Sequence, residues 1–210
     1  MVEVPVDYQK ATHGLMLMLG GLSSLFKRSF NIDFANITFS RSGREQGLNI
    51  DPSLIREMDS VEQALAEVRR IMLEEMEMDW PFFPYHGDVI KKRILIHGVD
   101  PEKGCKIETQ LPLVFRNCMV RVSLAHFGSE QEEPLCEGKH GLFCGLFEKV
   151  YRPGFDVEMT IPRSGRSACL LQLHFHEWVQ ERPQDENAEI IDLSQDRNNP
   201  ILSLSLARKV

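Results

Sequence analysis

Two thiols and an imidazole recur at four-residue intervals in one stretch of this chain, at Cys136, His140 and Cys144. On a helix this spacing puts the three side chains near one face, with a slow drift set by the 3.6-residue period. Thiolates and neutral imidazoles are the usual ligands of zinc. A cysteine can also act as a nucleophile when it lies near a helix N-terminus and a histidine serves as its base. A free cysteine among apolar neighbours also behaves as a small hydrophobe. Core thiols, the lining of a ligand pocket, and a metal or nucleophilic site therefore all remain open for this cluster.

His174 and His176 are a second group of residues that could bind a metal or take part in catalysis. Side chains alternate along a β-strand, so the two imidazoles share one face if this stretch is extended. Such a pair can bind a metal or pass protons. Two ordinary surface histidines on the polar face of a hairpin also explain the pattern.

Familiar catalytic motifs are absent from the sequence. It contains no G-x-G-x-x-G opening a helix after a strand and no Walker phosphate loop, and it lacks H-E-x-x-H, G-x-S-x-G and C-x-x-C. The residues alone therefore do not decide whether the protein is an enzyme.

The elements that would position these side chains are well marked. Residues 135–151 carry apolar side chains at helical spacing, which predicts a helix beneath the cysteine and histidine cluster. Residues 155–161 and 167–175 alternate apolar and polar side chains on either side of the turn 162–166, which predicts a β-hairpin.

The first half of the chain is read mainly as helix. Apolar periodicity predicts a helix over 6–30, and 40–48 looks like a short helix whose Gly43 and Gly47 permit close packing, or else a glycine-containing turn. Residues 31–39 fit either helix or strand. Asp51-Pro52 opens another helical stretch, and Ser60 begins a capping box ahead of the clearest apolar stripe.

Beyond that stripe, 80–87 contain two prolines and a glycine and are expected to form a loop, while 89–97 and 106–115 read as strands joined by a turn at 100–104. Segregated helices and strands predict an α+β fold, with a helical layer packed on an antiparallel β-sheet. We expect one domain over 1–180. Residues 181–210 are expected to be a polar linker followed by a C-terminal tail or a last strand at 201–206.

Composition limits the binding partners and the cellular compartment that we expect. The chain has 210 residues and a formal net charge of −7, which disfavours nucleic acid and anionic membranes as partners. Five cysteines, an odd count with irregular spacing, favour reduced thiols and a cytoplasmic location. The early apolar run 15–19 is too short to span a membrane and makes a poor secretion signal.

The stretch from Pro134 to Phe175 resembles the C-terminal half of the 4-vinyl reductase (hydrocarbon-binding) domain family. In that pattern a cysteine opens a helix with glycines and aromatics, and a strand with an acidic residue, a turn and a strand with another cysteine follow. Residues 40–47 also resemble the small-residue helix of the family's first half. The matching positions of the C-terminal half are Cys136, Gly141, Gly145, Phe147, Val157, Glu158, Gly165 and Cys169.

This resemblance implies an α+β ligand-binding fold, often dimeric, which is shared with transport protein particle subunits and with aromatic-sensing regulator domains. Some of those sensory domains hold zinc through three cysteines and a glutamate. Cys136, Glu158 and Cys169 match three of these positions, and Ile161 occupies the fourth. The resemblance therefore requires no cofactor and leaves zinc as an alternative.

Three functions follow as hypotheses. The first is a sensory module, a cytoplasmic homodimer that binds a small hydrophobic ligand between helices and sheet, lined by Cys136, His140, Cys144 and Phe147. The second is a cysteine- or metal-dependent hydrolase of a small amide or heterocyclic acid. The third is a non-catalytic assembly subunit, whose signature would be a large exposed apolar patch. The sequence identifies neither the ligand nor the protein partners.

Overall fold

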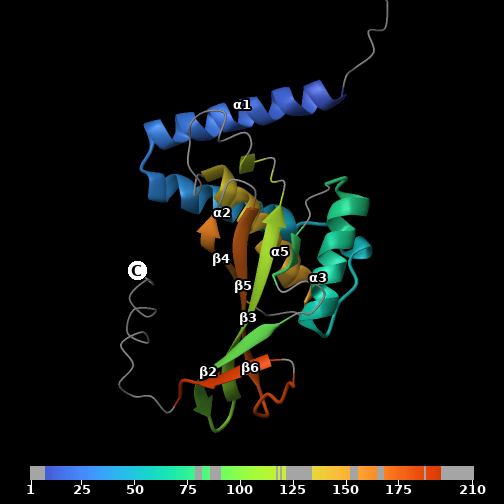
Figure 1. Cartoon of the computed structure of the whole chain (residues 1–210), viewed down its shortest axis with the longest axis vertical. Helices are drawn as coiled ribbons and strands as arrows, with labels where there is room; N and C mark the ends of the chain where they lie inside the picture. Colours follow the sequence, from blue (N-terminus) through green and yellow to red (C-terminus); the bar gives the residue numbers. More distant parts are fainter. Residues whose placement is uncertain are drawn as a thin grey trace, which may run out of the picture.

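A computed structural model describes residues 8–78, 82–85, 91–116, 118, 120–121, 134–151, 156–164, 168–186 and 188–194. The helices of this part are α1 (Tyr8–Ser29), α2 (Ile32–Leu48), α3 (Val61–Arg70) and α5 (Pro134–Val150), with short turns of 3-10 helix at Pro52–Leu54 and π-helix at Ile71–Glu75. The strands are β1 (Phe82–Pro84), β2 (Lys92–Asp100), β3 (Gly104–Arg116), β4 (Asp156–Ser164), β5 (Ala168–Val179) and β6 (Ala188–Asp192) (Figure 1).

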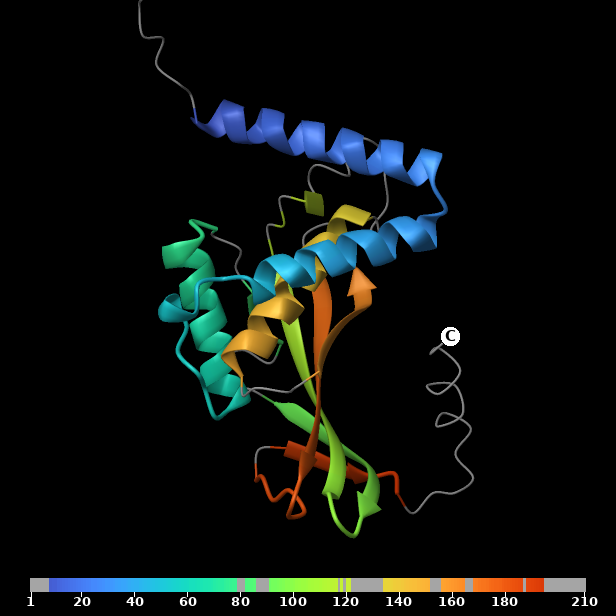
Figure 2. The ribbon, with the colours of Figure 1, turned by 180° about the vertical axis from the view of Figure 1, so that it is seen from behind.

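The predicted α+β class is confirmed. The strands form one sheet in the order β4-β5-β3-β2-β6, and the short β1 pairs with one end of β3. All pairs are antiparallel except β2 with β6. Helix α5 lies against the sheet and α2 packs along α5, while α3 stands at the side of α5 (Figure 2).

Helices α1 and α2 follow each other at the N-terminus. The expected helix over 6–30 corresponds to α1, and the ambiguous stretch 31–39 joins 40–48 in the single helix α2. Asn31 restarts the chain as a helix because its side-chain oxygen accepts a hydrogen bond from the Asp33 N–H at 2.8 Å. A local capping residue, rather than the apolar pattern, therefore decides the conformation of 31–39.

The close packing expected of the glycines in α2 is present. Gly43 and Gly47 of α2 lie against the backbone of α5, and Gly141 and Gly145 of α5 lie against the backbone of α2. A Cβ atom added to Gly43 would lie 1.9 Å from the Gly138 carbonyl oxygen, so only glycine permits this approach. The two helices therefore touch backbone to backbone along their length.

Helix α3 begins as its capping residues predict. The Ser60 hydroxyl oxygen accepts a hydrogen bond from the Gln63 N–H at 3.2 Å. The apolar stripe that follows is buried, from Val61 through Met72. The helical stretch expected after Asp51 is shorter than predicted, since only Pro52–Leu54 form a turn of 3-10 helix.

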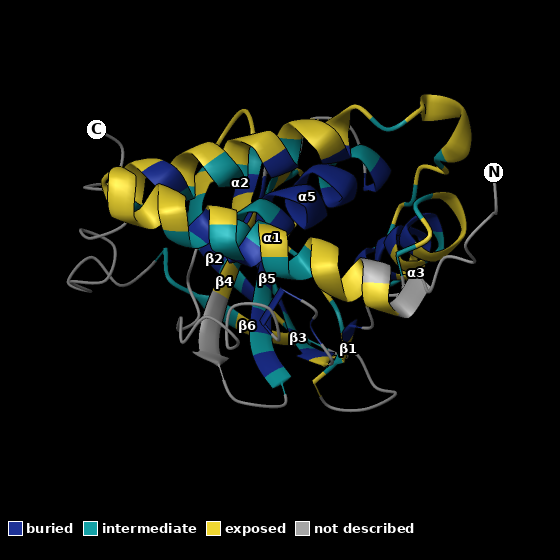
Figure 3. Ribbon diagram, turned by 90° about the horizontal axis from the view of Figure 1, so that it is seen from above, coloured by how far each residue is buried: buried dark blue, intermediate teal, exposed yellow. Residues whose placement is uncertain are grey.

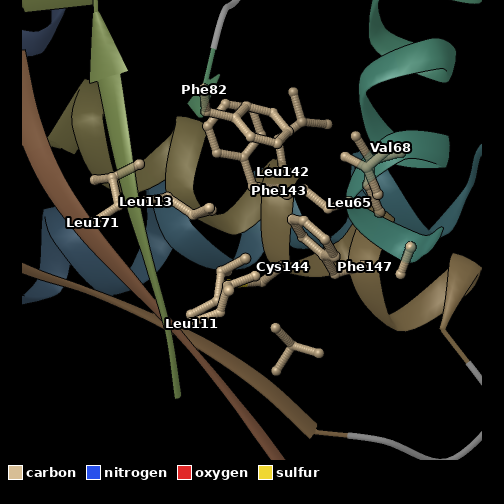
Figure 4. Close-up of a cluster of buried hydrophobic side chains, with 14 of the residues drawn as sticks. Leu65, Val68, Phe82, Leu111, Leu113, Leu142, Phe143, Cys144, Phe147 and Leu171 are labelled. Carbon is tan, nitrogen blue, oxygen red and sulfur yellow. The ribbon is translucent and has the colours of Figure 1, made fainter. Parts of the chain in front are cut away.

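The main hydrophobic core lies between α5, α3 and the inner face of the sheet (Figure 4). Aromatic rings connect its parts: the Phe143 ring centroid lies 5.8 Å from that of Phe115 on β3, and the Phe147 centroid lies 5.7 Å from that of Phe175 on β5. Phe82 of β1 completes the group, with its ring centroid 5.6 Å from that of Phe143. Burial of this aromatic layer is what holds α5 on the sheet.

Two strands extend into segments that we expected to be a loop or a turn. The turn between β2 and β3 is where it was expected, and Gly104 adopts φ 85°, a conformation that favours glycine. Phe82–Pro84, expected to lie in a loop, pair with β3 instead. Strand β4 continues to Ser164, through the first part of the expected turn, by way of a register shift after Thr160.

Strand β6 lies within the segment expected to be a polar linker. Ala188–Asp192 pair in parallel with β2, and Ala188 packs against a small core of Ile94, Ile96, Cys105 and Ile107. Residues 188–192 therefore belong to the sheet, and the expected division of the chain at residue 180 stays a prediction. The last strand proposed at 201–206 lies outside the described residues.

Among the helices described, none combines enough length and apolar character to cross a lipid bilayer.

Candidate functional site

The residues expected to line a ligand pocket are all in the interior. Cys136, His140, Cys144 and Phe147 are buried in α5. Figure 4 shows Cys144 beside Leu111 of β3, and the neighbouring ring of Phe147 stacks edge-on against Phe175 of the sheet. These side chains are therefore in the interior, where the protein's own aromatic side chains pack beside them.

His140 is the most unusual of these residues. Its ring is almost completely buried, Nδ1 lies 3.6 Å from Glu137 Oε1, and Nε2 has no hydrogen-bond partner among the described residues. Burial lowers the pKa of His140 because the charged form would lose its water, and the nearby Glu137 only partly opposes that effect. His140 is therefore a neutral imidazole with one buried nitrogen open to a partner.

The three residues that match a zinc site do not converge. Cys136 and Cys169 belong to the same hydrophobic core. Glu158 pairs across the strands with His174, so it projects from the opposite face of the sheet, and its side chain is 63% exposed. Within the described ranges no three His, Cys, Asp or Glu side chains are grouped so as to hold a metal ion.

The cysteines themselves are all buried and free of disulfides. Cys118 lies 3.8 Å from the Lys139 ammonium, which also sits 4.5 Å above the Phe115 ring. The Cys136 thiol is only 5% exposed. A thiol that attacks an external substrate needs more access to solvent than this.

Polar side chains gather instead on the outer face of the sheet, opposite α5. His174 of β5 and Glu108 of β3 are diagonal neighbours in the antiparallel register, in which Glu108 pairs with His176 and Gln110 with His174. His174 Nδ1 lies 2.7 Å from Glu108 Oε1. The pair is partly shielded, since only 15% of the His174 side chain and 11% of the Glu108 side chain are exposed.

Glu108 is the centre of this network. Its Oε2 lies 2.7 Å from His97 Nε2 of β2, and the Gln110 amide donates to its Oε1 at 2.7 Å. Burial alone would raise the pKa of Glu108, but the hydrogen bonds from His174, His97 and Gln110 outweigh it and hold the pKa well below its usual range. Glu108 is therefore a carboxylate at neutral pH, and it accepts from all three neighbours.

The charge on Glu108 fixes the tautomer of His174. An ionised carboxylate only accepts, so Nδ1 of the neutral His174 ring carries the hydrogen and Nε2 is the acceptor. Nε2 lies 2.8 Å from the Thr160 hydroxyl of β4, which must then donate to it. Carboxylate, imidazole and hydroxyl thus form a directed chain across β3, β5 and β4.

His174 and His176 lie on the same face, as their spacing predicted. Their rings are stacked with centroids 6.5 Å apart. His176 Nε2 is 3.9 Å from Glu158 Oε2 and makes no hydrogen bond to a described residue. His174 therefore takes part in the network through Glu108, whereas His176 stands beside it.

A third feature is an apolar surface on the two N-terminal helices. It consists of eight large side chains that are 38% to 68% exposed, which we call the α1–α2 apolar face: Leu15, Met18, Leu22, Leu25, Phe26, Phe30, Phe34 and Ile37. Figure 3 shows exposed residues along the outer sides of both helices. Phe26, Phe30 and Phe34 form a continuous row, with successive ring centroids 5.5 and 6.2 Å apart, that joins α1 to α2.

No protein-family model matches this chain. No curated protein matches it either. The kinship to the 4-vinyl reductase family therefore stays a prediction.

Sequence reasoning found one member of the outer-face network and missed the others. His174 was identified from the His-x-His spacing, but Glu108, His97 and Thr160 lie on three other strands, far away in sequence. Only the strand register brings them together, and no local pattern encodes that register. The α1–α2 apolar face had a visible signal, because its residues recur at helical spacing, but the sequence does not show which apolar positions stay uncovered.

Proposed function

We propose that this protein is an assembly module that works as a homodimer, with the α1–α2 apolar face as its self-association surface. The observation that carries the proposal is a set of eight exposed apolar side chains on two consecutive helices, in which the rings of Phe26, Phe30 and Phe34 form a continuous row. Monomeric proteins rarely expose a contiguous apolar patch larger than a few hundred Å². A surface of this kind is therefore expected to be covered by a partner.

The size of the face fits a second copy of the chain. Taking a fully exposed large apolar side chain as about 200 Å², the eight residues expose roughly 900 Å², which is close to the ~800 Å² that each partner buries in a standard interface. In a twofold-symmetric dimer the same patch meets itself, so one continuous apolar strip on each copy is sufficient. The family resemblance, which implies frequent dimerisation, points in the same direction.

The test is the mass of the particle in solution. The wild-type chain is expected to sediment as a dimer at micromolar concentration, and the double variant Met18→Glu with Phe34→Glu as a monomer, because two buried carboxylates would face each other without partners. Leu73→Glu is the matched control, since Leu73 is 56% exposed and apolar but lies outside the α1–α2 apolar face. This control should stay dimeric.

Circular dichroism separates dissociation from unfolding, because both variants should keep the wild-type helix signal. A wild-type chain that is monomeric at these concentrations would overturn the proposal. Dissociation by Leu73→Glu as well would show that the interface is elsewhere.

A second candidate function is the binding of a small hydrophobic ligand with one polar group next to α5. The buried Nε2 of His140, which lacks a described partner, favours it. A ligand hydroxyl that donates to that nitrogen would satisfy it, since an unmet hydrogen bond in the interior costs about 1–3 kcal/mol. Native mass spectrometry of the purified full chain should show a bound small molecule that is absent from His140→Phe. A wild-type spectrum without added mass would count against this function.

A further inference from the structure

We propose that the outer face of the sheet is a hydrolytic site in which the Thr160 hydroxyl is the nucleophile, His174 its general base and Glu108 the residue that positions the base. This site is separate from the α1–α2 apolar face and from the cysteines of α5, and it does not depend on dimerisation.

The geometry supports each of these roles. A nucleophile and its base must lie within about 2.6–3.2 Å, and the base must be oriented by a third group. The Thr160 hydroxyl is 2.8 Å from His174 Nε2, and His174 Nδ1 is 2.7 Å from Glu108. Because the carboxylate fixes the hydrogen on Nδ1, the lone pair of Nε2 faces the hydroxyl proton, which is the arrangement that removes it during attack.

The network also holds the base in place. Glu108 is fixed by His97 on its other oxygen and by Gln110, and Gln110 in turn accepts a hydrogen bond from the Gln172 amide at 2.7 Å. His174 is therefore held from its Nδ1 side by a carboxylate that cannot easily rotate. Thr160 itself is exposed, so its hydroxyl is accessible from solvent while its base is shielded.

The reaction that this arrangement supports is ester hydrolysis through an acyl-threonine. The Thr160 oxygen forms a bond to the ester carbonyl carbon as its proton passes to His174 Nε2, and the alcohol leaves with that proton when the C–O bond breaks. Water then attacks the acyl group and gives a proton to His174. That proton returns to the Thr160 oxygen as the acid departs, which restores the enzyme.

The surroundings select the substrate class. Glu108 and Glu158 make this part of the outer face negative, so a small uncharged ester suits it better than an anionic one. Gln172 is the cross-strand partner of Thr160. Its amide carries a second hydrogen besides the one given to Gln110, and that hydrogen is suited to the developing oxyanion.

The experiment measures turnover of 4-nitrophenyl acetate by the full chain and maps the acetylated residue by mass spectrometry after an acid quench. We expect acetyl-Thr160 in the wild type and a loss of about a hundredfold in rate for both Thr160→Val and His174→Gln. Thr160→Ser keeps a hydroxyl, so position 160 should still be acetylated. His176→Gln is the matched control, because it changes an imidazole on the same strand and face whose Nε2 makes no hydrogen bond to a described residue.

Glu108 needs a readout that a purely structural role would not change. Glu108→Gln keeps the shape of the side chain but removes the carboxylate that orients His174 through Nδ1. The kcat should therefore fall while KM stays unchanged, because Glu108 acts through the base and does not touch the substrate.

Three results would overturn the proposal. The first is a wild-type chain that neither turns over the ester nor is acetylated at Thr160. The second is Thr160→Val with wild-type activity, and the third is acetylation confined to histidine or lysine side chains. Circular dichroism of each variant shows whether a lower rate is caused by unfolding. The acetylation of the wild-type protein is a test that does not depend on whether the variants fold.

Discussion

Replacing Gly141 with alanine tests the backbone contact between α2 and α5. The new Cβ atom would lie 2.0 Å from the Ser40 carbonyl oxygen and 2.9 Å from the Arg44 nitrogen, whereas ordinary contact begins near 3.4 Å. Both neighbours are backbone atoms, which cannot rotate away as a flexible side chain would. The two helices must therefore separate by about 1 Å or more, and the packing along their whole length loosens.

The loss of stability from overpacking is partly offset by the higher helix propensity of alanine. Overpacking costs typically 1–3 kcal/mol, and the rigid backbone contact places this case at about 3. Alanine favours a helix over glycine by about 1 kcal/mol, so Gly141→Ala should lower the free energy of unfolding by roughly 2 kcal/mol. Gly138→Ala is the matched control on the same helix, because its Cβ would meet the Phe39 ring at 3.5 Å, an ordinary contact. That control should be more stable than wild type by about 0.5–1 kcal/mol.

Urea or thermal unfolding followed by circular dichroism measures the difference, at one fixed protein concentration because association changes the apparent stability. The two alanine variants should differ by about 3 kcal/mol, which corresponds to roughly 6–12 °C in Tm for a protein of this size. If Gly141→Ala is as stable as Gly138→Ala, α2 and α5 do not touch through their glycines.

Three further predictions concern charged and titrating groups. Burial lowers the pKa of His140 in the native state, so the unfolded chain binds a proton that the native protein does not. The free energy of unfolding should therefore fall as the pH drops below about 6.5. Denaturant titrations of His140→Gln should lack this part of the pH dependence. The hydrogen bonds to Glu108 outweigh its burial and lower its pKa. The stabilisation that the Glu108 carboxylate provides is therefore complete above pH 4.5 and is lost as the pH falls further. In Glu108→Gln the free energy of unfolding should depend less on pH in this acid range. Glu148, whose side chain is 10% exposed, pairs with Arg44 and accepts a hydrogen bond from the Val157 N–H at 3.0 Å. Thermal unfolding should show that Glu148→Ala costs about 1–3 kcal/mol, more than Arg44→Ala, because it leaves a buried N–H without its acceptor.

Local signals were sufficient for much of the fold. The Ser60 cap, the apolar stripe after it and the alternation around the hairpin depend on neighbouring residues, and the structure contains each of them. The two glycines of α2 also indicated a close approach, although their partners on α5 could not be read from that pattern alone.

What could not be predicted depends on pairing between distant segments. Strand β6 is short and lies in polar surroundings, and it becomes a strand because β2 offers it a parallel edge. Phe82–Pro84 similarly become a strand by pairing with β3. The outer-face network follows the same logic, since Glu108 and Thr160 meet His174 only in the final register.

The parallel seam between β2 and β6 has a consequence for biosynthesis. Until residues 188–192 have left the ribosome, β2 is an open sheet edge, and Ala188 does not yet pack against the small core that contains Ile94 and Ile96. Nascent or prematurely terminated chains are therefore vulnerable to cross-pairing with foreign strands during this interval. A truncation or fusion junction placed just after Val179 would make that vulnerability permanent, so recombinant boundaries belong beyond Ser194.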